Sequence, residues 1–201
     1  MSDPPPRFRR YASEVRAAML VEAGLAVLAK GGITAFTVDN ICRRAKTSRG
    51  LIAHHFGGKE GLLVAIYHAA YAPLLADLTA DLSVDGVLDR LFSPEHFTRE
   101  SLNIWLSLWG EVAVNAGLQA EHRANYAAFR AAVATAIRRD AKTPVDAEAL
   151  AAALIALADG LWLELCFAPD LMSADRAKRT CRMLLTPILQ GPAPKAGAGR
   201  I

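Results

Sequence analysis

Cysteine is scarce in this 201-residue chain, and the three cysteines that occur are far apart. Cys42, Cys166 and Cys181 form no CxxC pair, and their odd number does not suit the disulfide framework of a small secreted domain. The opening residues, MSDPPPRFRRYASEV, contain no apolar stretch of the kind that a secretory signal peptide needs. We therefore expect a protein of the reducing cytoplasm.

Long uninterrupted apolar runs are also missing, although 53% of the residues are hydrophobic and the mean hydropathy is +0.21. A membrane-spanning helix needs roughly 20 predominantly apolar residues. The most apolar window, LAAALIALADGLWLELCF, is interrupted by Asp159, Gly160 and Glu164 and owes much of its length to alanine. This composition favours a buried helix, and we predict no membrane partner.

Strand signals are nearly absent, and apolar residues recur at intervals of three and four, which predicts an all-α fold. Between about residues 83 and 97 this pattern loosens, and both chain ends are predicted to be disordered. The expected first helix runs from a Ser13 cap to Gly31-Gly32, and two short helices follow from caps at Thr37 and Ser48. Further helices are expected from Lys59 through Leu74 and over 98–115 and 118–139. The last two are expected from a Thr143 cap, with Pro144 at the first position, to Phe167 and over 173–189.

Charge is unevenly distributed along the chain. Residues 1–62 hold ten basic and five acidic side chains, whereas the remainder holds 13 basic and 15 acidic ones. A basic head on a mildly acidic body suggests that the head meets a polyanion. An ordinary solvated surface accounts for the charge alone equally well. We divide the chain into an N-terminal arm and head over 1–58, a larger helical domain over 59–190 and a tail over 191–201.

Two short helices joined by the Ala45–Ser48 segment predict a helix-turn-helix. The second helix of such a pair can lie in the major groove of DNA with its N-terminal residues at the base edges. Ser48 can contact a phosphate, and Arg49 can donate two hydrogen bonds to guanine. Gly50 has no side chain, so the backbone can approach the groove closely. The segment TSRGLIAHHF therefore has the residue types of a DNA-reading helix.

The adjacent histidines His54 and His55 are residue types that also occur in zinc sites and catalytic centres. Zinc needs converging ligands, but adjacent helical residues point about 100° apart, and no second cluster supplies further ligands. A catalytic base needs a nucleophile or acid in reach, and none is visible nearby. His55 is favoured to pack against Leu51 and Phe56. The residues favour DNA binding over a purely structural role, with this candidate set: Thr37, Arg44, Lys46, Ser48, Arg49, Gly50, Leu51, His54, His55 and Lys59.

The larger half suggests dimerisation and small-molecule sensing. Helices over about 146–167 and 173–189 are candidates for a two-fold interface, since a palindromic operator is read by two-fold partners. Their apolar stripe packs either across that interface or within one subunit. Aromatic side chains with a carboxylate suit a quaternary ammonium ligand, although aromatics at helical spacing are more often core. The candidate ligand set is Trp105, Trp109, Glu111, Tyr126, Asp159 and Trp162.

The segment FTVDNICRRAKTSRGLIAHHFGGKEGLLVAI resembles the N-terminal signature of the TetR family of bacterial transcription regulators. Ten residues match in order and spacing: Thr37, Ile41, Ala45, Ser48, Gly50, Ile52, His54, Phe56, Lys59 and Leu62. The resemblance implies an all-helical homodimer with a DNA-binding head and a ligand-binding and dimerisation domain. One departure is Lys46, where the family usually has glycine. A positive φ there would strain lysine modestly, or the turn differs, or Lys46 adds a phosphate contact.

The larger half resembles the choline-responsive, betaine-regulon branch of the same family. The likeness rests on NIWLSLWGEVAVNAGLQAEHRANYAAFRAAVATAIRRD and on AALIALADGLWLELCF, whose DGLW element is Asp159 to Trp162. It implies a repressor whose operator binding is relieved by choline or another quaternary ammonium compound. Homologues with a different small hydrophobic or cationic ligand are a plausible alternative. We see no converging acid, base or nucleophile, and expect neither enzyme activity, a cofactor nor a metal.

Overall fold

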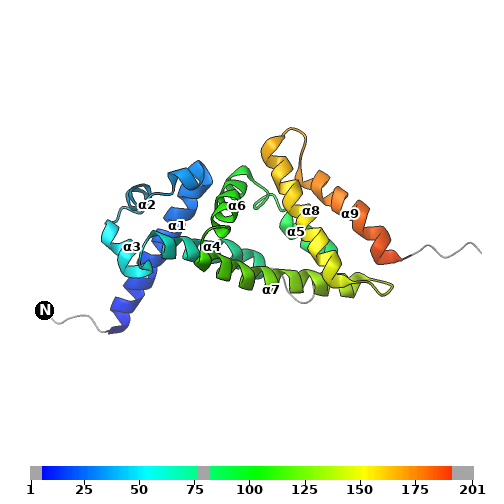
Figure 1. The fold of residues 1–201 in the computed structure, drawn as a ribbon, viewed down its shortest axis with the longest axis horizontal. Helices are drawn as coiled ribbons and strands as arrows, with labels where there is room; N and C mark the ends of the chain where they lie inside the picture. The colour runs from blue at the N-terminus through cyan, green and yellow to red at the C-terminus, as the bar shows by residue number, and fades with distance from the viewer. Residues whose placement is uncertain (1–5, 77–81, 192–201) are drawn as a thin grey trace, which may run out of the picture. The chain divides into compact units, whose positions relative to one another are not determined.

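The computed structural model describes residues 6–76 and 82–191, with side chains from residue 13 onward, and this part consists of α-helices without strands (Figure 1). The all-α prediction is confirmed. The predicted disorder of the extreme ends falls outside the described residues. The helices are α1 (Pro6–Ala35), α2 (Val38–Ala45), α3 (Arg49–Phe56), α4 (Lys59–Ala76), α5 (Val84–Leu91), α6 (Arg99–Val112), α7 (Ala116–Asp140), α8 (Ala147–Phe167) and α9 (Ala174–Gln190).

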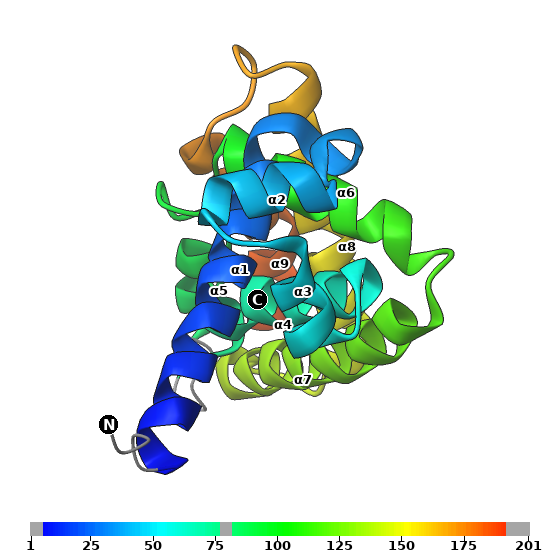
Figure 2. The same cartoon turned by 90° about the vertical axis from the view of Figure 1, so that its left-hand side faces the viewer.

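The first of two compact units contains α1 to α4, α6 and the start of α7, up to Tyr126. Within it α1 packs along α6 and against α2, and α2 packs against α3 (Figure 2). Helix α1 also approaches α4 closely at Gly24, because a Cβ atom added there would clash with Cδ1 of Ile66. The core of this unit includes Leu20, Leu28, Phe36, Ile41, Ile52, Leu62, Ile66, Tyr67, Leu102, Leu108 and Leu118.

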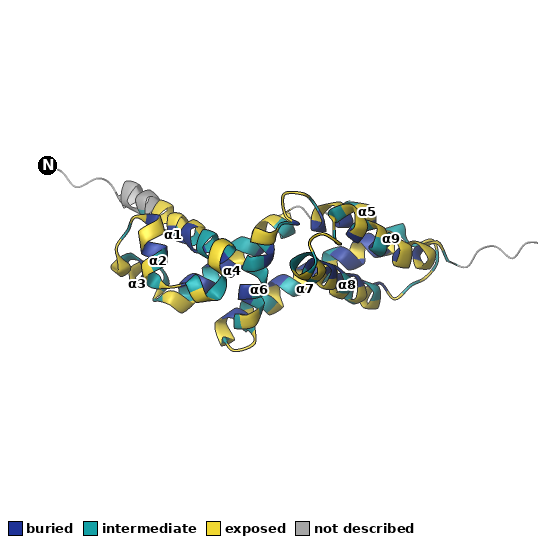
Figure 3. Ribbon diagram, turned by 90° about the horizontal axis from the view of Figure 1, so that it is seen from above, coloured by how far each residue is buried: buried dark blue, intermediate teal, exposed yellow. Residues whose placement is uncertain are grey.

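The second unit contains α5, the rest of α7, α8 and α9. Helix α9 packs against both α5 and α8. Two ion pairs join α5 to α9, from Arg182 Nε to Asp85 at 2.7 Å and from Lys178 Nζ to Asp89 at 3.2 Å. In Figure 3 the buried residues of each unit lie on the inward sides of its helices. The division reflects packing, and the functional boundary near residue 58 stays a prediction.

Two predicted helix starts are wrong. Helix α1 begins at Pro6, so Ser13 lies inside it and is no cap; proline suits the first position of a helix, and arginine-rich residues extend it. Helix α8 is capped by Asp146, whose Oδ1 accepts a 3.0 Å hydrogen bond from the Ala149 N–H, and Thr143 and Pro144 precede it. A carboxylate caps a helix as well as a hydroxyl does, and here it is the nearer group.

Helix α5 lies where the helical pattern of the sequence loosens, so it was not among the predicted helices. Ser83 caps it by accepting a hydrogen bond from the Gly86 N–H at 3.1 Å. Its apolar residues at positions 84, 87, 88 and 91 follow helical spacing and are all buried. The Asp140 carboxylate also accepts the Val84 N–H at 2.7 Å. Such a short helix depends on these tertiary contacts, because eight residues alone do not form a stable helix.

Two segments, Ser13–Ala35 and Ala147–Phe167, are long and apolar enough to cross a membrane by length and mean hydropathy alone, at 1.4 and 1.8. Core helices pass the same test. The second segment is α8, which includes the alanine-rich window interpreted as a buried helix. Seven of its residues are buried: Ala147, Ala151, Leu154, Ile155, Ala158, Leu161 and Trp162.

Candidate functional site

The turn between α2 and α3 is built by local hydrogen bonds. Thr37 caps α2 as predicted, because its extended backbone lets Oγ1 accept the Asn40 N–H at 3.2 Å. The buried residues Ile41, Cys42 and Ala45 anchor α2 on the core. Its polar side is therefore exposed, and Arg43 and Arg44 in the last turn suit the negative end of the helix dipole.

Lys46 ends α2 in a left-handed conformation, with φ 52° and ψ 45°. Of the alternatives considered for this turn, a positive φ at lysine is the one observed, and no other described residue apart from glycines has one. The Lys46 N–H donates to the carbonyls of Arg43 and Cys42, which the end of α2 would otherwise leave unpaired. Lysine thus occupies a geometry that glycine adopts without strain, and its side chain is exposed.

The first turn of α3 is open to solvent. Ser48 occupies the N-cap position with extended geometry, but its side chain makes no capping hydrogen bond, so the prediction of a side-chain cap is wrong. Arg49 is 73% exposed, and its Nη2 lies 2.6 Å from Oδ1 of Asp39 on α2. A Cβ atom at Gly50 would meet only Ser48 Oγ, at 4.0 Å. Packing therefore does not require glycine at position 50.

The other predicted DNA contacts divide by exposure. Eight of the ten candidates are exposed, and Leu51 and His55 are partly buried. His55 Nε2 is buried without a hydrogen-bond partner, and its ring meets that of His54 edge-on at 4.9 Å. Lys59 Nζ lies 5.7 Å from the centre of the Phe36 ring. The structure thus brings an exposed polar surface together on α2, α3 and the start of α4.

A cluster of aromatic rings forms in the first unit. Trp105 and Trp109 stack on α6 with ring centres 6.1 Å apart, as their spacing predicted. Two residues of α4 join them, since Tyr71 meets Trp105 edge-on at 4.9 Å and Tyr67 does so at 6.2 Å. Tyr67 is fully buried, whereas Trp105 and Trp109 keep part of their surface accessible.

The cluster continues onto α7. Tyr67 Oη and His122 Nδ1 share a 2.7 Å hydrogen bond, and the His122 ring stacks on Tyr126 at 5.2 Å. Burial lowers the pKa of His122 below its ordinary value of 6.5, which favours the neutral ring. Hydrogen bonds from Asn125 and His68 lower the pKa of Glu121, so that carboxylate stays ionised beside the cluster.

Sequence reasoning missed Tyr67, Tyr71 and His122. Tyr67 and Tyr71 are four residues apart on a predicted helix, so a shared face was visible in the sequence. The sequence did not indicate, however, that this helix face contacts a tryptophan 34 or more positions later. We define the aromatic cluster as Tyr67, Tyr71, Trp105, Trp109, His122 and Tyr126.

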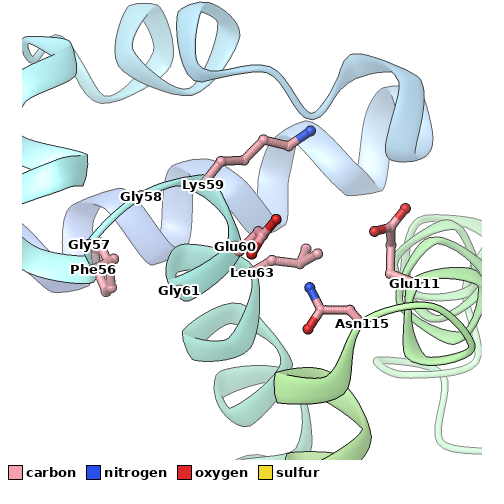
Figure 4. Close-up of a pocket in the computed structure, with 9 residues that line it drawn as sticks. All are labelled: Phe56, Gly57, Gly58, Lys59, Glu60, Gly61, Leu63, Glu111 and Asn115. Carbon is pink, nitrogen blue, oxygen red and sulfur yellow. The ribbon is translucent and has the colours of Figure 1, made fainter.

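Glu111 lies elsewhere in the same unit. It lines an open cleft of about 510 Å³ beside the turn between α3 and α4 (Figure 4). Glu60, Glu111 and Asn115 face this space, whereas Lys59 extends away from them. The remaining lining residues are Phe56, Gly57, Gly58, Gly61 and Leu63.

Asp159 and Trp162 belong to the second unit. The Trp162 indole N–H donates to the Leu91 carbonyl at 3.2 Å, and its ring packs edge-on against Phe97 at 5.4 Å. These contacts give Trp162 a packing role in its own unit. Desolvation raises the pKa of Asp159 to about 6, although part of the residue is exposed. Among the described residues, no three His, Cys, Asp or Glu side chains are grouped to hold a metal.

Comparison with protein families gives two matches that together span most of the chain. Residues 20–66 match the bacterial regulatory proteins of the tetR family, and residues 68–190 match the C-terminal domain of BetI-type transcriptional repressors. The chain is also similar to the HTH-type transcriptional regulator BetI 1 of Chromohalobacter salexigens, with 28% identity over 82% of this chain and 86% of that one. These families are transcription regulators rather than enzymes.

Solved structures agree with this fold. A transcriptional regulator from Pseudomonas aeruginosa PAO1 aligns with a TM-score of 0.73 and 31% identity over 85% of this chain and 88% of that one. A transcriptional regulator from Saccharomonospora viridis, solved in complex with choline, aligns with a TM-score of 0.69 and 22% identity over 87% and 96% of the two chains. At that identity the second likeness concerns the fold.

Proposed function

Because the chain belongs to the BetI-type transcriptional repressors of the tetR family, we propose that it is a homodimer whose operator binding is relieved by a quaternary ammonium compound. Choline is the first candidate, and betaine aldehyde is the second. The repressor acts in the cytoplasm, where two heads occupy successive major grooves of a palindromic operator, about 34–36 Å apart.

The exposed first turn of α3 is the observation that carries the DNA contact. Asp39 holds Arg49 near the helix start by one contact, so further N–H donors of the guanidinium are available. The Ser48 hydroxyl is not used as a cap. Guanine presents two acceptors to such an arginine in the major groove. Lys46, Arg44 and Lys59 then bind flanking phosphates, which fix the position of the head without reading sequence.

The dimer contact is assigned to α8 and α9. Met183, Leu184 and Ile188 form an exposed apolar strip on α9, although large apolar side chains are usually covered. The exposed side of α8 carries small residues, Ala153, Ala156 and Gly160, which allow another helix to approach closely. A two-fold pairing of these surfaces covers the same strip on both subunits.

The aromatic cluster is the proposed effector site. Its tryptophans are partly accessible, and a quaternary ammonium cation binds the electron-rich faces of such rings. The choline complex of the Saccharomonospora viridis regulator supports this ligand class for the shared fold. Glu111, Asp159 and Trp162 remain sequence-based candidates for contacts to the ligand. The second candidate function is a regulator of the same type that senses another small hydrophobic or cationic compound.

The link between effector and head runs through α6. This helix carries Trp105 and Trp109, and its Asn103 Nδ2 donates to the Ala29 carbonyl of α1 at 2.9 Å. Since α1 also packs on α2, a shift of α6 reaches the head. A ligand moves the equilibrium only through unequal affinity for two head spacings, and coupling of about 1–3 kcal/mol is typical.

A mobility-shift assay with the palindrome from the protein's own promoter tests the proposal. Choline should release the duplex, whereas its uncharged isostere 3,3-dimethylbutan-1-ol should leave the complex intact. Release by both compounds would favour an apolar effector instead. No salt-sensitive binding to any duplex would refute the repressor itself, because phosphate contacts dominate DNA affinity.

A further inference from the structure

One acidic residue lies on the proposed DNA-binding surface. Residues 37–59 contain five basic side chains and a single acid, Asp39. Asp39 stands in the first turn of α2, and its Oδ1 is 2.6 Å from Nη2 of Arg49 on α3. The pair therefore joins the two helices of the helix-turn-helix. An acid beside DNA repels phosphates, so a carboxylate at this position weakens backbone binding unless it serves another purpose.

The polar residues beside the Asp39–Arg49 pair on α2 have other hydrogen-bond partners. Arg43, the basic residue four positions after Asp39, donates to Asn40 Oδ1 at 3.0 Å instead. Asn40 Nδ2 in turn donates to the Ala35 carbonyl at 2.8 Å. The start of α2 is already capped by Thr37. The Asp39 carboxylate is thus directed at Arg49 rather than at the other cations of the surface.

We propose that Asp39 is a positioning residue for base recognition, which orients the Arg49 guanidinium before DNA arrives and withholds it from phosphates. This inference rests on the proposed contact of Arg49 with a base. A guanidinium has five N–H donors, so one bond to Asp39 leaves enough for a two-bond contact with guanine. Ordering the long side chain in advance reduces the entropy lost on binding.

The same carboxylate disfavours the competing partner. Without Asp39, Arg49 is free to pair with any backbone phosphate, which carries no sequence information. Discrimination is a difference between two affinities, and an element that weakens the wrong complex raises it. Asp39 therefore lowers binding to mixed-sequence DNA more than binding to the operator.

Four full-length variants separate these effects: Asp39→Asn, Arg49→Ala, the double variant and the control Asp85→Asn. Asp85 is matched, because it also lies in the first turn of an eight-residue helix and pairs with an arginine of another helix, at 2.7 Å. Each protein selects duplexes from a random pool. Affinity for the wild-type consensus, its single-base-pair variants and sonicated mixed-sequence DNA is then measured at several salt concentrations.

For Asp39→Asn we expect about a tenfold loss of preference at the base pair that Arg49→Ala also affects, because a bidentate contact is worth ~1–3 kcal/mol of discrimination. Binding to mixed-sequence DNA should tighten, and its salt dependence should steepen by about 0.9 for one added phosphate contact. Asp85→Asn should change neither. In the Arg49→Ala background, Asp39→Asn should not alter base preference.

Asp39→Glu keeps the charge and should restore part of the preference, which a merely structural role of Asp39 would not predict. If Asp39→Asn is unfolded by circular dichroism, Asp39→Ser, which suits a first helical turn, takes its place. Wild-type preference in a folded Asp39 variant, with preference lost in Arg49→Ala, overturns the positioning role alone. Unchanged preference in Arg49→Ala refutes the proposed base contact and this inference together.

Discussion

The proposed DNA-binding surface and the aromatic cluster are built in opposite ways. The surface comes from the continuous segment 37–59, and most of its polar side chains are exposed, with the Asp39–Arg49 pair ten positions apart joining α2 to α3. The cluster takes rings from α4, α6 and α7, which lie up to 59 positions apart, and buries Tyr67 completely. A substitution in such a local surface should alter one contact, whereas a substitution among the packed rings should alter the whole cluster.

The largest expected separation comes from Trp105→Leu. Leucine keeps an apolar side chain but removes the ring that Tyr71 and Trp109 contact. Choline affinity should fall about 30-fold, equivalent to ~2 kcal/mol for a desolvated cation–π contact. Operator affinity without choline should remain as in the wild type. Calorimetry measures the first quantity and a mobility shift the second.

A matched control for that variant is Phe129→Leu, which removes a buried ring from the second unit. It should lower stability and leave choline affinity unchanged. Equal loss of choline binding in both variants would mean that the effect is general destabilisation, and the cluster would lose its proposed role.

A smaller effect is expected for Lys46→Gly. Glycine adopts the left-handed φ of 52° without the strain of a side chain, so the free energy of unfolding should rise by about 1 kcal/mol. The same change would remove the proposed phosphate contact, and the slope of log affinity against log salt should then decrease by about 1. Chemical denaturation and salt-dependent binding measure the two. Reduced stability would show that Lys46 makes a contact that outweighs the strain.

Gly50→Ala should change the stability of the fold and the affinity for DNA in opposite directions. An alanine side chain has open space at this position and favours helix, so stability should rise by about 0.5–1 kcal/mol. Operator affinity should nevertheless fall, because the methyl group keeps the backbone away from the groove. Gly110→Ala on α6, which also has open space, should raise stability in the same way without affecting DNA binding. Unchanged operator affinity in Gly50→Ala would place the groove elsewhere.

The smallest expected change is in pH dependence. Burial lowers the pKa of His122, so the stability that its neutral ring contributes is present above about pH 6.5 and is lost as the pH falls through the folded pKa. His122→Gln should flatten the dependence of the denaturation midpoint on pH between pH 5 and 7.5. An unchanged slope in this variant would show that other groups control stability in this pH range.

The sequence predicted local features of the head correctly for a physical reason. The Thr37 cap and the start of α4 at Lys59 each depend on contacts within four or five positions. Such contacts follow from residue type and spacing. Membership of the tetR family was visible in the same segment, since caps, glycines and core positions agree along it.

Several of the errors arise where distant contacts determine the structure, although the missing Ser48 cap and the two wrong helix starts are local errors. Helix α5 depends on Asp140 and on burial against distant residues, and its eight residues gave a weak periodic signal. At the start of α8 two possible caps compete, and Asp146 rather than Thr143 occupies the position. Tyr67 and His122 join the aromatic cluster through a hydrogen bond across 55 positions. A single sequence does not indicate which helix faces pack together when they lie that far apart along the chain.

The start of α3 has no side-chain cap, and the Leu51 N–H donates to the Ser48 carbonyl. In the proposed complex an incoming phosphate oxygen would supply the acceptor that the Ser48 side chain does not, so the nucleic acid would complete the element that reads it. Before that encounter the segment should exchange its amide hydrogens readily, and afterwards slowly. DNA binding and the ordering of this helix start would then occur together, and the bound operator would supply the contacts that order it.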